Sequence, residues 1–186
     1  MRLCQIDLFR PLFLSVAALA ALLAFACGGD EGASDEGASD EGTEVPREPV
    51  QEDITLDGQT ISTLHSPFDI GVIAEAFDGD INTVARTAKV NPAVFELSFP
   101  EPRSLTGLTV TTSVMEKMTF TATIFSDTGG EPAVYSQEFK NDSPPDLTVD
   151  LNFDPVPPPT KKIRIEVKNL NDSEFGIIHV YEIVLR

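Results

Sequence analysis

The clearest pattern in this chain is the alternation of apolar and polar residues along its C-terminal two thirds. Ile163, Ile165 and Val167 alternate with lysine, arginine and glutamate. This period of two is typical of a β-strand that buries one face. Seven segments have this character or a similar β-rich composition. The residues predicted as strands are 94–99, 108–113, 119–126, 133–139, 147–153, 161–167 and 177–185.

The segments between the predicted strands are rich in residues that favour turns, above all proline, glycine and asparagine. Upstream of them, Asp57-Gly58 lies between two short β-rich runs. This dipeptide predicts a hairpin turn, because it supports positive φ angles. Short strands at this spacing, without a convincing long helix, predict an all-β chain. We expect an antiparallel β-sandwich of about eight strands.

A separate apolar run of fifteen residues, 12–26, lies near the N-terminus. It is shorter than the roughly 20 residues that a membrane-spanning helix needs, and it suits the apolar part of a signal peptide. Its end, Ala26-Cys27-Gly28, resembles the lipobox of bacterial lipoproteins. The resemblance implies cleavage before Cys27, lipidation of its thiol, and export to a bacterial cell envelope with a lipid anchor in the membrane. Two alternatives stay open: an uncleaved anchor, and secretion after cleavage at Ala24-Phe25-Ala26.

Residues 28–53 have a different composition from the rest. They contain three pentapeptides that begin Asp-Glu-Gly, and they hold ten acidic residues against one basic residue. A segment so charged and so poor in core-forming residues is predicted to be a disordered spacer. The predicted organisation is therefore a signal segment (1–27), an acidic linker (28–53) and a folded domain (54–186).

The net charge of −17 is shared between the linker and the domain. The domain alone has nineteen acidic and ten basic residues. Phosphate backbones repel such a charge, which argues against nucleic-acid binding. The only cysteines, Cys4 and Cys27, lie in the leading segment, so no disulfide is available to the folded domain.

One loop gathers oxygen-bearing side chains, in the order Asp78-Gly79-Asp80-Ile81-Asn82-Thr83. Hard oxygen ligands of this kind suit calcium better than they suit a soft metal. The spacing of the first acidic residues is similar to that of an EF-hand loop. The EF-hand requires glycine at the sixth position and a bidentate glutamate at the twelfth, where this chain has Thr83 and Lys89. An EF-hand is therefore excluded.

A different family accounts for the loop and for the strands around it. The loop with its threonine, the strand segment 96–99, Arg164-Ile165 and the closing Tyr181-Glu182-Ile183 together resemble the F5/8 type C (discoidin-like) domain. The resemblance covers 64–186. It implies a galactose-binding-like jelly roll, a fold also found in many carbohydrate-binding modules.

The resemblance also implies a structural calcium ion between this loop and the last strand. Its ligands would be two carboxylates, an oxygen of Asp80, the hydroxyl and carbonyl of Thr83, and main-chain carbonyls from two further residues. The implied ligands are Asp78, Asp80, Thr83 and Glu182, with carbonyls from Glu75 and Tyr181. The alternative is an ordinary solvated turn without a metal.

The ligand surface departs from the family pattern. Where the family usually has an aromatic residue two positions after the threonine, this chain has Ala85, and it contains no tryptophan. The candidate ligand contacts are polar residues just past the loop and one phenylalanine beside a loop: Arg86, Lys89, Asn91 and Phe68. The alternatives for them are surface charge, ion pairing and core packing.

Catalysis finds little support in the chain. His65 and His179 are its only histidines, and it has no Gly-x-Ser-x-Gly elbow. We expect a non-catalytic lipoprotein that recognises carbohydrate or another cell-surface ligand. The alternative is a protein–protein interaction or a structural subunit of an envelope complex that binds no sugar. No prediction of the oligomeric state follows.

Overall fold

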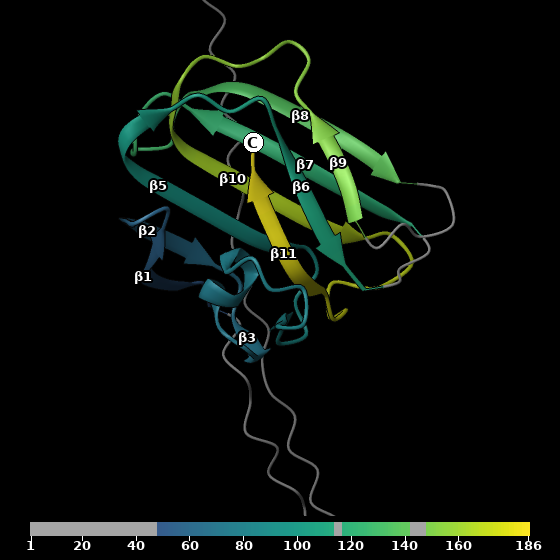
Figure 1. Ribbon diagram of the computed structural model, residues 1–186. Coiled ribbons are helices and arrows are strands. Elements are labelled where there is room, and N and C mark those ends of the chain that lie inside the picture. The colour runs from purple at the N-terminus through teal and green to yellow at the C-terminus, as the bar shows by residue number, and fades with distance from the viewer. Residues whose placement is uncertain (1–47, 114–116, 142–147) are drawn as a thin grey trace, which may run out of the picture. The chain divides into compact units, whose positions relative to one another are not determined.

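The computed structural model describes residues 48–113, 117–141 and 148–186. Within them, eleven strands form two antiparallel sheets that face each other (Figure 1). The six-stranded sheet runs, in spatial order, β1 (Val50–Leu56), β2 (Gln59–His65), β5 (Ala93–Arg103), β10 (Thr160–Asn169), β7 (Met118–Phe125) and β8 (Ala133–Asn141). The five-stranded sheet runs β3 (Phe68–Ile70), β4 (Ala85–Thr87), β11 (His179–Leu185), β6 (Gly107–Thr112) and β9 (Thr148–Asn152).

The core lies between the sheets and follows the alternation seen in the sequence. Along β10, Ile163, Ile165 and Val167 are fully buried, while the intervening side chains remain partly exposed. Each sheet contributes one apolar face, as in other β-sandwiches. The largest fully buried side chains are Phe95, Phe99, Phe120, Ile61, Ile73, Leu97, Leu108, Met118, Ile124, Leu151, Ile163 and Ile165.

Each of the seven segments predicted as strands contains a strand in the structure, so the all-β sandwich is confirmed; residue 147, at the start of one of them, lies outside the described residues. The predicted hairpin turn joins β1 to β2, and Asp57 (φ 52°) and Gly58 (φ 75°) both have positive φ. Positive φ at both central residues is the requirement of a type I′ turn. Besides this hairpin, the two three-residue strands β3 and β4 bring the described total to eleven, where about eight were expected.

The domain boundary differs from the expected one. β1 begins at Val50, and its first four residues pair with β2 from His65 back to Ser62. Residues 50–53, assigned to the linker because of their charge, therefore belong to the sheet. They pair at an edge of the sheet, where exposed charged side chains are common. The signal segment, Cys27 and most of the acidic linker lie outside the described residues.

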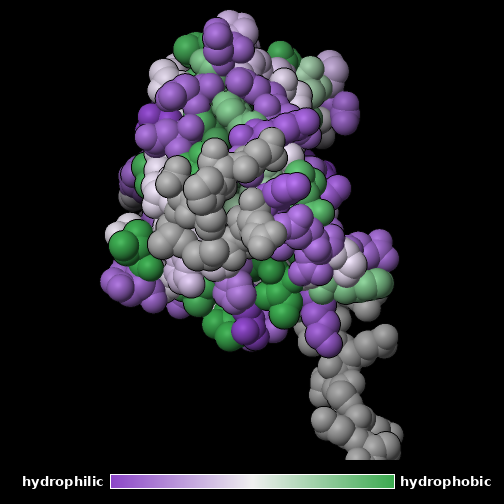
Figure 2. Space-filling view, turned by 90° about the vertical axis from the view of Figure 1, so that its right-hand side faces the viewer, coloured by the Kyte–Doolittle hydropathy of each residue, from purple (hydrophilic) through white to green (hydrophobic). Residues whose placement is uncertain are grey.

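The surface of the described part can be seen on one face. On the face seen in Figure 2, hydrophobic residues lie in small groups among hydrophilic ones. None of the helices in the described residues is long and apolar enough to span a membrane.

Two sets of contacts determine where candidate sites lie. A short 3-10 helix, η1 (Ile73–Phe77), packs against β11 and delivers the acidic loop to the last strand. The connection between β4 and β5 is hydrogen-bonded to the connection between β10 and β11 through Asn91. Loops from distant parts of the sequence are thereby held close to the sheets.

Candidate functional site

The acidic loop begins where η1 ends. Ile73, Ala76 and Phe77 of this short helix are buried in the core, so the chain is anchored just before Asp78. Gly79 then has φ 80°, a conformation that glycine adopts without steric cost. The apolar anchor and the glycine together present the following oxygen-bearing residues on the outside of the sandwich.

Oxygen atoms of this loop converge on the hydroxyl of Thr83. Its Oγ1 lies 2.8 Å from the carbonyl oxygen of Asp80, 3.1 Å from Oδ2 of Asp78 and 3.3 Å from the carbonyl oxygen of Glu75. A hydroxyl has one hydrogen to donate, so it cannot satisfy three acceptors at once. A cation among carboxylate, hydroxyl and carbonyl oxygens would attract all of them, and this donor set fits calcium.

The carboxylates of the loop also accept hydrogen bonds from its own backbone. Asp78 Oδ1 accepts from the Asp80 N–H at 2.8 Å, and Asp80 Oδ1 accepts from the backbone and side chain of Asn82 at 2.9 and 2.7 Å. The bonds from Asn82 lower the pKa of Asp80. Asp80 therefore turns its carboxylate toward Asn82 and its carbonyl toward Thr83, so its carbonyl is the oxygen that joins the cluster.

Glu182 connects this loop to the last strand. Its Oε2 accepts a hydrogen bond from the Gly79 N–H at 2.8 Å, across 103 positions of sequence. The residue is only 6% exposed. Burial raises the pKa of Glu182, and the nearby carboxylates of Asp78 and Asp80 raise it further, although the Gly79 bond acts in the opposite direction. We name Glu75, Asp78, Asp80, Thr83 and Glu182 the clasp.

The two residues expected to contribute carbonyls differ in their placement. The Glu75 carbonyl belongs to the oxygen cluster, while its carboxylate accepts from the Val72 N–H at 3.1 Å. Tyr181 lies at a register shift in β11, between the positions that pair with Thr112 and Thr111 of β6. Such a bulge leaves a residue unpaired in the ladder and redirects its backbone. Among the described residues, no group of three His, Cys, Asp or Glu side chains is placed to hold a metal ion.

Arg86, a predicted ligand contact, is committed to another residue. Its Nε and Nη2 donate to the two carboxylate oxygens of Asp69 at 2.8 and 2.9 Å. This bidentate pair joins β4 to β3 and lowers the pKa of Asp69, mainly through the hydrogen bonds. The ion-pair alternative therefore describes Arg86 in this structure.

Asn91 is a buried structural residue, which corrects its expected role as a ligand contact. It is 6% exposed, and its Nδ2 donates to the carbonyls of Asn169 and Ser173, both at 2.9 Å. Its Oδ1 accepts from the Asn169 N–H at 3.0 Å. An amide that satisfies the backbone of a neighbouring loop has little capacity left for a ligand.

The other two predicted contacts lie in different surroundings. Phe68 is half-buried and stacks on His65, with ring centroids 4.7 Å apart, so it belongs mainly to packing. Lys89 is exposed and has φ 56°. The four residues Arg86, Lys89, Asn91 and Phe68 thus do not form a common contact surface of free side chains.

A groove that the sequence did not reveal lies on the outer side of the six-stranded sheet. It encloses about 340 Å³, within the range of small-molecule sites. Its floor includes Leu64, Glu96 and Arg164, which are in register across β2, β5 and β10. Its full lining is Pro49, Leu64, His65, Ser66, Pro67, Val90, Pro92, Val94, Glu96 and Arg164.

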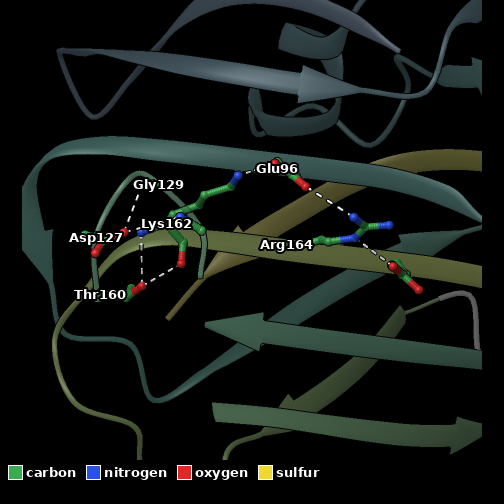
Figure 3. Close-up of polar contacts among 8 residues, drawn as sticks. Glu96, Asp127, Gly129, Thr160, Lys162 and Arg164 are labelled. Carbon is green, nitrogen blue, oxygen red and sulfur yellow. Dashed lines mark hydrogen bonds and ion pairs between the residues drawn. The ribbon is translucent and has the colours of Figure 1, made fainter. Parts of the chain in front are cut away.

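The charged residues in the groove and directly beside it neutralise one another. Glu96 Oε2 lies 2.5 Å from Lys162 Nζ, and Glu96 Oε1 lies 3.3 Å from Arg164 Nη1 (Figure 3). Arg164 Nε also lies 2.7 Å from Oε1 of Glu166. Two cations and two carboxylates therefore alternate across β5 and β10. We call this set the groove network.

The polar groups of the β2–β3 connection line the same groove. Ser66 Oγ accepts from the Val94 N–H at 3.0 Å, which leaves its hydroxyl hydrogen to be directed elsewhere. His65 contacts the Ser66 carbonyl at 2.7 Å and Glu52 Oε1 at 3.2 Å. Since His65 is buried and stacked on Phe68, it holds the groove wall in place.

His179, the second histidine, lies outside the groove lining. Its Nδ1 is 3.4 Å from Ser113 Oγ, and it pairs with Arg86 across β11 and β4. Burial lowers the pKa of His179, and the charge of Arg86 lowers it further. The carboxylate of Asp69, whose charge acts in the opposite direction on this pKa, is held by Arg86. This geometry gives no support to a serine–histidine–aspartate triad.

No family model matches the sequence, and no curated protein matches it. Solved structures with similar folds include a pectin-binding carbohydrate-binding module, with 15% identity, a TM-score of 0.53, and coverage of 74% of this chain and 92% of that one. A fucose-binding module of Streptococcus pneumoniae has 18% identity and a TM-score of 0.52, covering 73% and 97%. The family 32 module of C. perfringens NanJ, in complex with galactose, has 16% identity and a TM-score of 0.51, covering 67% and 92%.

At these identities the similarity establishes the fold. The described part of the chain has the β-sandwich fold of these modules, which is the fold that the resemblance to the discoidin-like domain implied.

Proposed function

We propose that this protein is a non-catalytic recognition module that binds carbohydrate in the groove. The observation that carries the proposal is a concave site of about 340 Å³ on a fold shared with modules whose names specify pectin, fucose or galactose. Ligand sites are commonly concave and mostly apolar, with a few polar groups that fix orientation. The groove has this composition.

The residues of the groove supply both kinds of contact that a sugar needs. Leu64, Val94 and the neighbouring prolines offer apolar surface to C–H groups. Arg164 donates hydrogen bonds, Glu96 accepts them, and the Ser66 hydroxyl can donate to a sugar oxygen. Arg164 and Glu96 already hold each other in place, so little side-chain ordering is required when a ligand binds.

A glycan array probed with the full chain tests the proposal. Leu64→Arg fills the groove with a long charged side chain and should abolish binding of any glycan retained by the wild type. Val134→Arg is the matched control, because Val134 is a similarly exposed apolar residue on β8, outside the groove lining. Equal loss in both variants contradicts the groove as the site. No glycan binding, beside a reproducible protein partner, favours the interaction function instead.

We further propose that the clasp holds a structural calcium ion. Carboxylate oxygens of Asp78 and Glu182, the Thr83 hydroxyl and the carbonyls of Glu75 and Asp80 would hold it. The ion would be the counterion for the negative charge of these carboxylates. Support comes from the three acceptors around one hydroxyl and from the raised pKa of Glu182 beside two other carboxylates. Bound only to the folded state, the ion would stabilise the protein.

The proposed location is the bacterial cell envelope, with Cys27 lipidated and residues 28–49 as a spacer. Support comes from the sequence alone: the apolar run ends at Ala26-Cys27, and the acidic pentapeptides follow directly. Labelling with a fatty-acid analogue in the native host should mark the wild type and leave Cys27→Ser unlabelled. Cys4→Ser is the matched control and should keep the label. Release of an unlabelled wild-type protein into the medium contradicts the anchor.

A further inference from the structure

The groove contains one deeply placed charge. Glu96 is 8% exposed, and it lies in the floor between Leu64 on β2 and Arg164 on β10. The walls around it are largely prolines and valines. A ligand that enters this groove loses much of its water and comes close to a carboxylate.

The cations nearest to Glu96 are already engaged. Lys162 and Arg164 bind its two carboxylate oxygens (Figure 3). Glu166 accepts a hydrogen bond from a second nitrogen of Arg164. Their formal charges sum to zero, two positive and two negative. The groove network therefore offers no surplus positive charge to an incoming anion.

A sugar carboxylate would meet unfavourable electrostatics at this site. Desolvating a carboxylate is costly unless a cation pairs with it, and like charges repel more strongly at low dielectric. The domain adds to the repulsion, since residues 54–186 hold nineteen acidic and ten basic residues. Hydroxyl groups of an uncharged sugar avoid both costs, because they donate to Glu96 and accept from Arg164.

We infer that the groove selects uncharged sugars over uronic acids, and that Glu96 is the residue that determines this selectivity. The inference rests on the proposed carbohydrate-binding function and narrows it. The similar folds leave this choice open, because they include both a pectin-binding module and modules named for galactose or fucose. The groove network decides it in favour of the uncharged class.

The test compares two sets of oligosaccharides by calorimetry with the full chain at physiological ionic strength. One set is uncharged, with galactose or fucose at its ends; the other consists of galacturonate and mannuronate oligomers of equal length. The wild type should bind members of the uncharged set at least tenfold more tightly than any uronate. Glu96→Gln should reduce this ratio at least tenfold, because Lys162 and Arg164 then carry surplus positive charge.

Two more variants complete the design. Glu101→Gln removes an exposed carboxylate farther along β5 and should leave the ratio unchanged. Glu166→Gln frees Arg164 from one partner at a half-buried position, and it replaces Glu96→Gln if that variant does not fold. Binding of uronates as tight as that of uncharged sugars overturns the selectivity but leaves the function standing. Binding of neither set overturns the proposed function and the selectivity with it.

Discussion

The groove network and the clasp each contain a buried carboxylate, but they balance its charge differently. In the groove, Glu96 contacts both Lys162 and Arg164. In the clasp, Glu182 is stabilised by a backbone N–H, and the charges that act on it are the carboxylates of Asp78 and Asp80. The first site carries its own counterions, and the second is short of positive charge.

This difference predicts which site depends on solution conditions. A carboxylate paired with cations of the same chain is complete without any added ion. Carboxylates and carbonyls that face one another become more stable when a cation binds between them. We therefore expect the groove to depend on intramolecular bonds and the clasp to depend on calcium.

The largest effect should come from the amide that holds the groove wall. Val90 and Pro92 line the groove on either side of Asn91, whose side chain binds the β10–β11 connection. Asn91→Ala leaves several backbone groups without partners and should cost about 3 kcal/mol of unfolding free energy. Thermal denaturation should show a Tm roughly 10 °C lower.

If the groove depends on intramolecular bonds alone, the loss in Asn91→Ala will be equal with calcium and with chelator. Asn82→Ala is the matched control, because Asn82 is exposed and its amide donates to Asp80 within the acidic loop. A loss of unfolding free energy below about 1 kcal/mol would mean that Asn91 contributes little to stability. Its predicted role as a ligand contact would then have to be considered again.

The clasp should respond to calcium by a comparable amount. At a concentration 100 times Kd, a ligand specific for the folded state adds about 2.7 kcal/mol. For a domain of this size, that corresponds to a rise in Tm of roughly 8 °C. Asp78→Ala should remove the response, since Asp78 contributes a carboxylate to the Thr83 cluster.

Glu101→Ala provides the reference for the calcium response, because it deletes an exposed carboxylate outside the clasp. It should retain the full rise in Tm. A wild-type Tm that is the same in calcium and in chelator would show that the loop is an ordinary acidic turn.

Replacing one glutamate of each site by glutamine should change the stability of the protein in opposite directions, or only at the groove. In chelator, Glu96→Gln leaves Lys162 and Arg164 with weaker partners and should lower stability by about 2 kcal/mol. Under the same conditions, Glu182→Gln keeps an acceptor for the Gly79 N–H and removes repulsion from Asp78 and Asp80, so stability should stay equal or rise. Urea denaturation measures both, and a similar loss in the two variants would erase the distinction.

The parts of this architecture that the sequence predicted are those with local signals. Alternation along β10 and the Asp57-Gly58 turn depend on neighbouring residues, and both are present in the structure. β3 and β4 are three residues long, too short for a period of two to be recognised. β4 pairs with β11 and β3 pairs with β4, and no local pattern encodes this pairing.

The candidate sites show the same limit. The groove joins Pro49, Leu64, Val90 and Arg164, which are more than one hundred positions apart at the extremes. The one sequence signal that could have indicated the groove is Leu64, an apolar residue at a strand position that faces outward. The position of Asn91 just after the loop predicts a ligand contact, whereas its burial depends on the distant β10–β11 connection. The link from the acidic loop to Glu182 was expected only through the family resemblance.

The smallest effect should come from the ion pair of Asp69 and Arg86. Its two charges neutralise each other, as those of the groove network do, but the pair is hydrated at the surface. Hydrogen bonds from Arg86 lower the pKa of Asp69 below its usual 3.8. A carboxyl group whose pKa is lower in the folded state stabilises the protein at any pH above its pKa in the unfolded state. This stabilisation is lost as the pH falls through the pKa of the folded state. Asp69→Asn should therefore differ from the wild type at neutral pH, and the difference should shrink as the pH falls from about 4 toward 2.

Urea denaturation across this pH range, with Arg86→Gln as the partner variant, completes the comparison. Each single variant loses the same interaction between Asp69 and Arg86. The double variant should therefore lose less unfolding free energy than the two single variants lose together. Both single variants should keep the full calcium response, since neither residue belongs to the clasp. A difference for Asp69→Asn that is constant down to about pH 2 would mean that its effect does not come from the charge of the pair. In that case charge balance by the protein's own cations would matter at the buried groove and not at the surface.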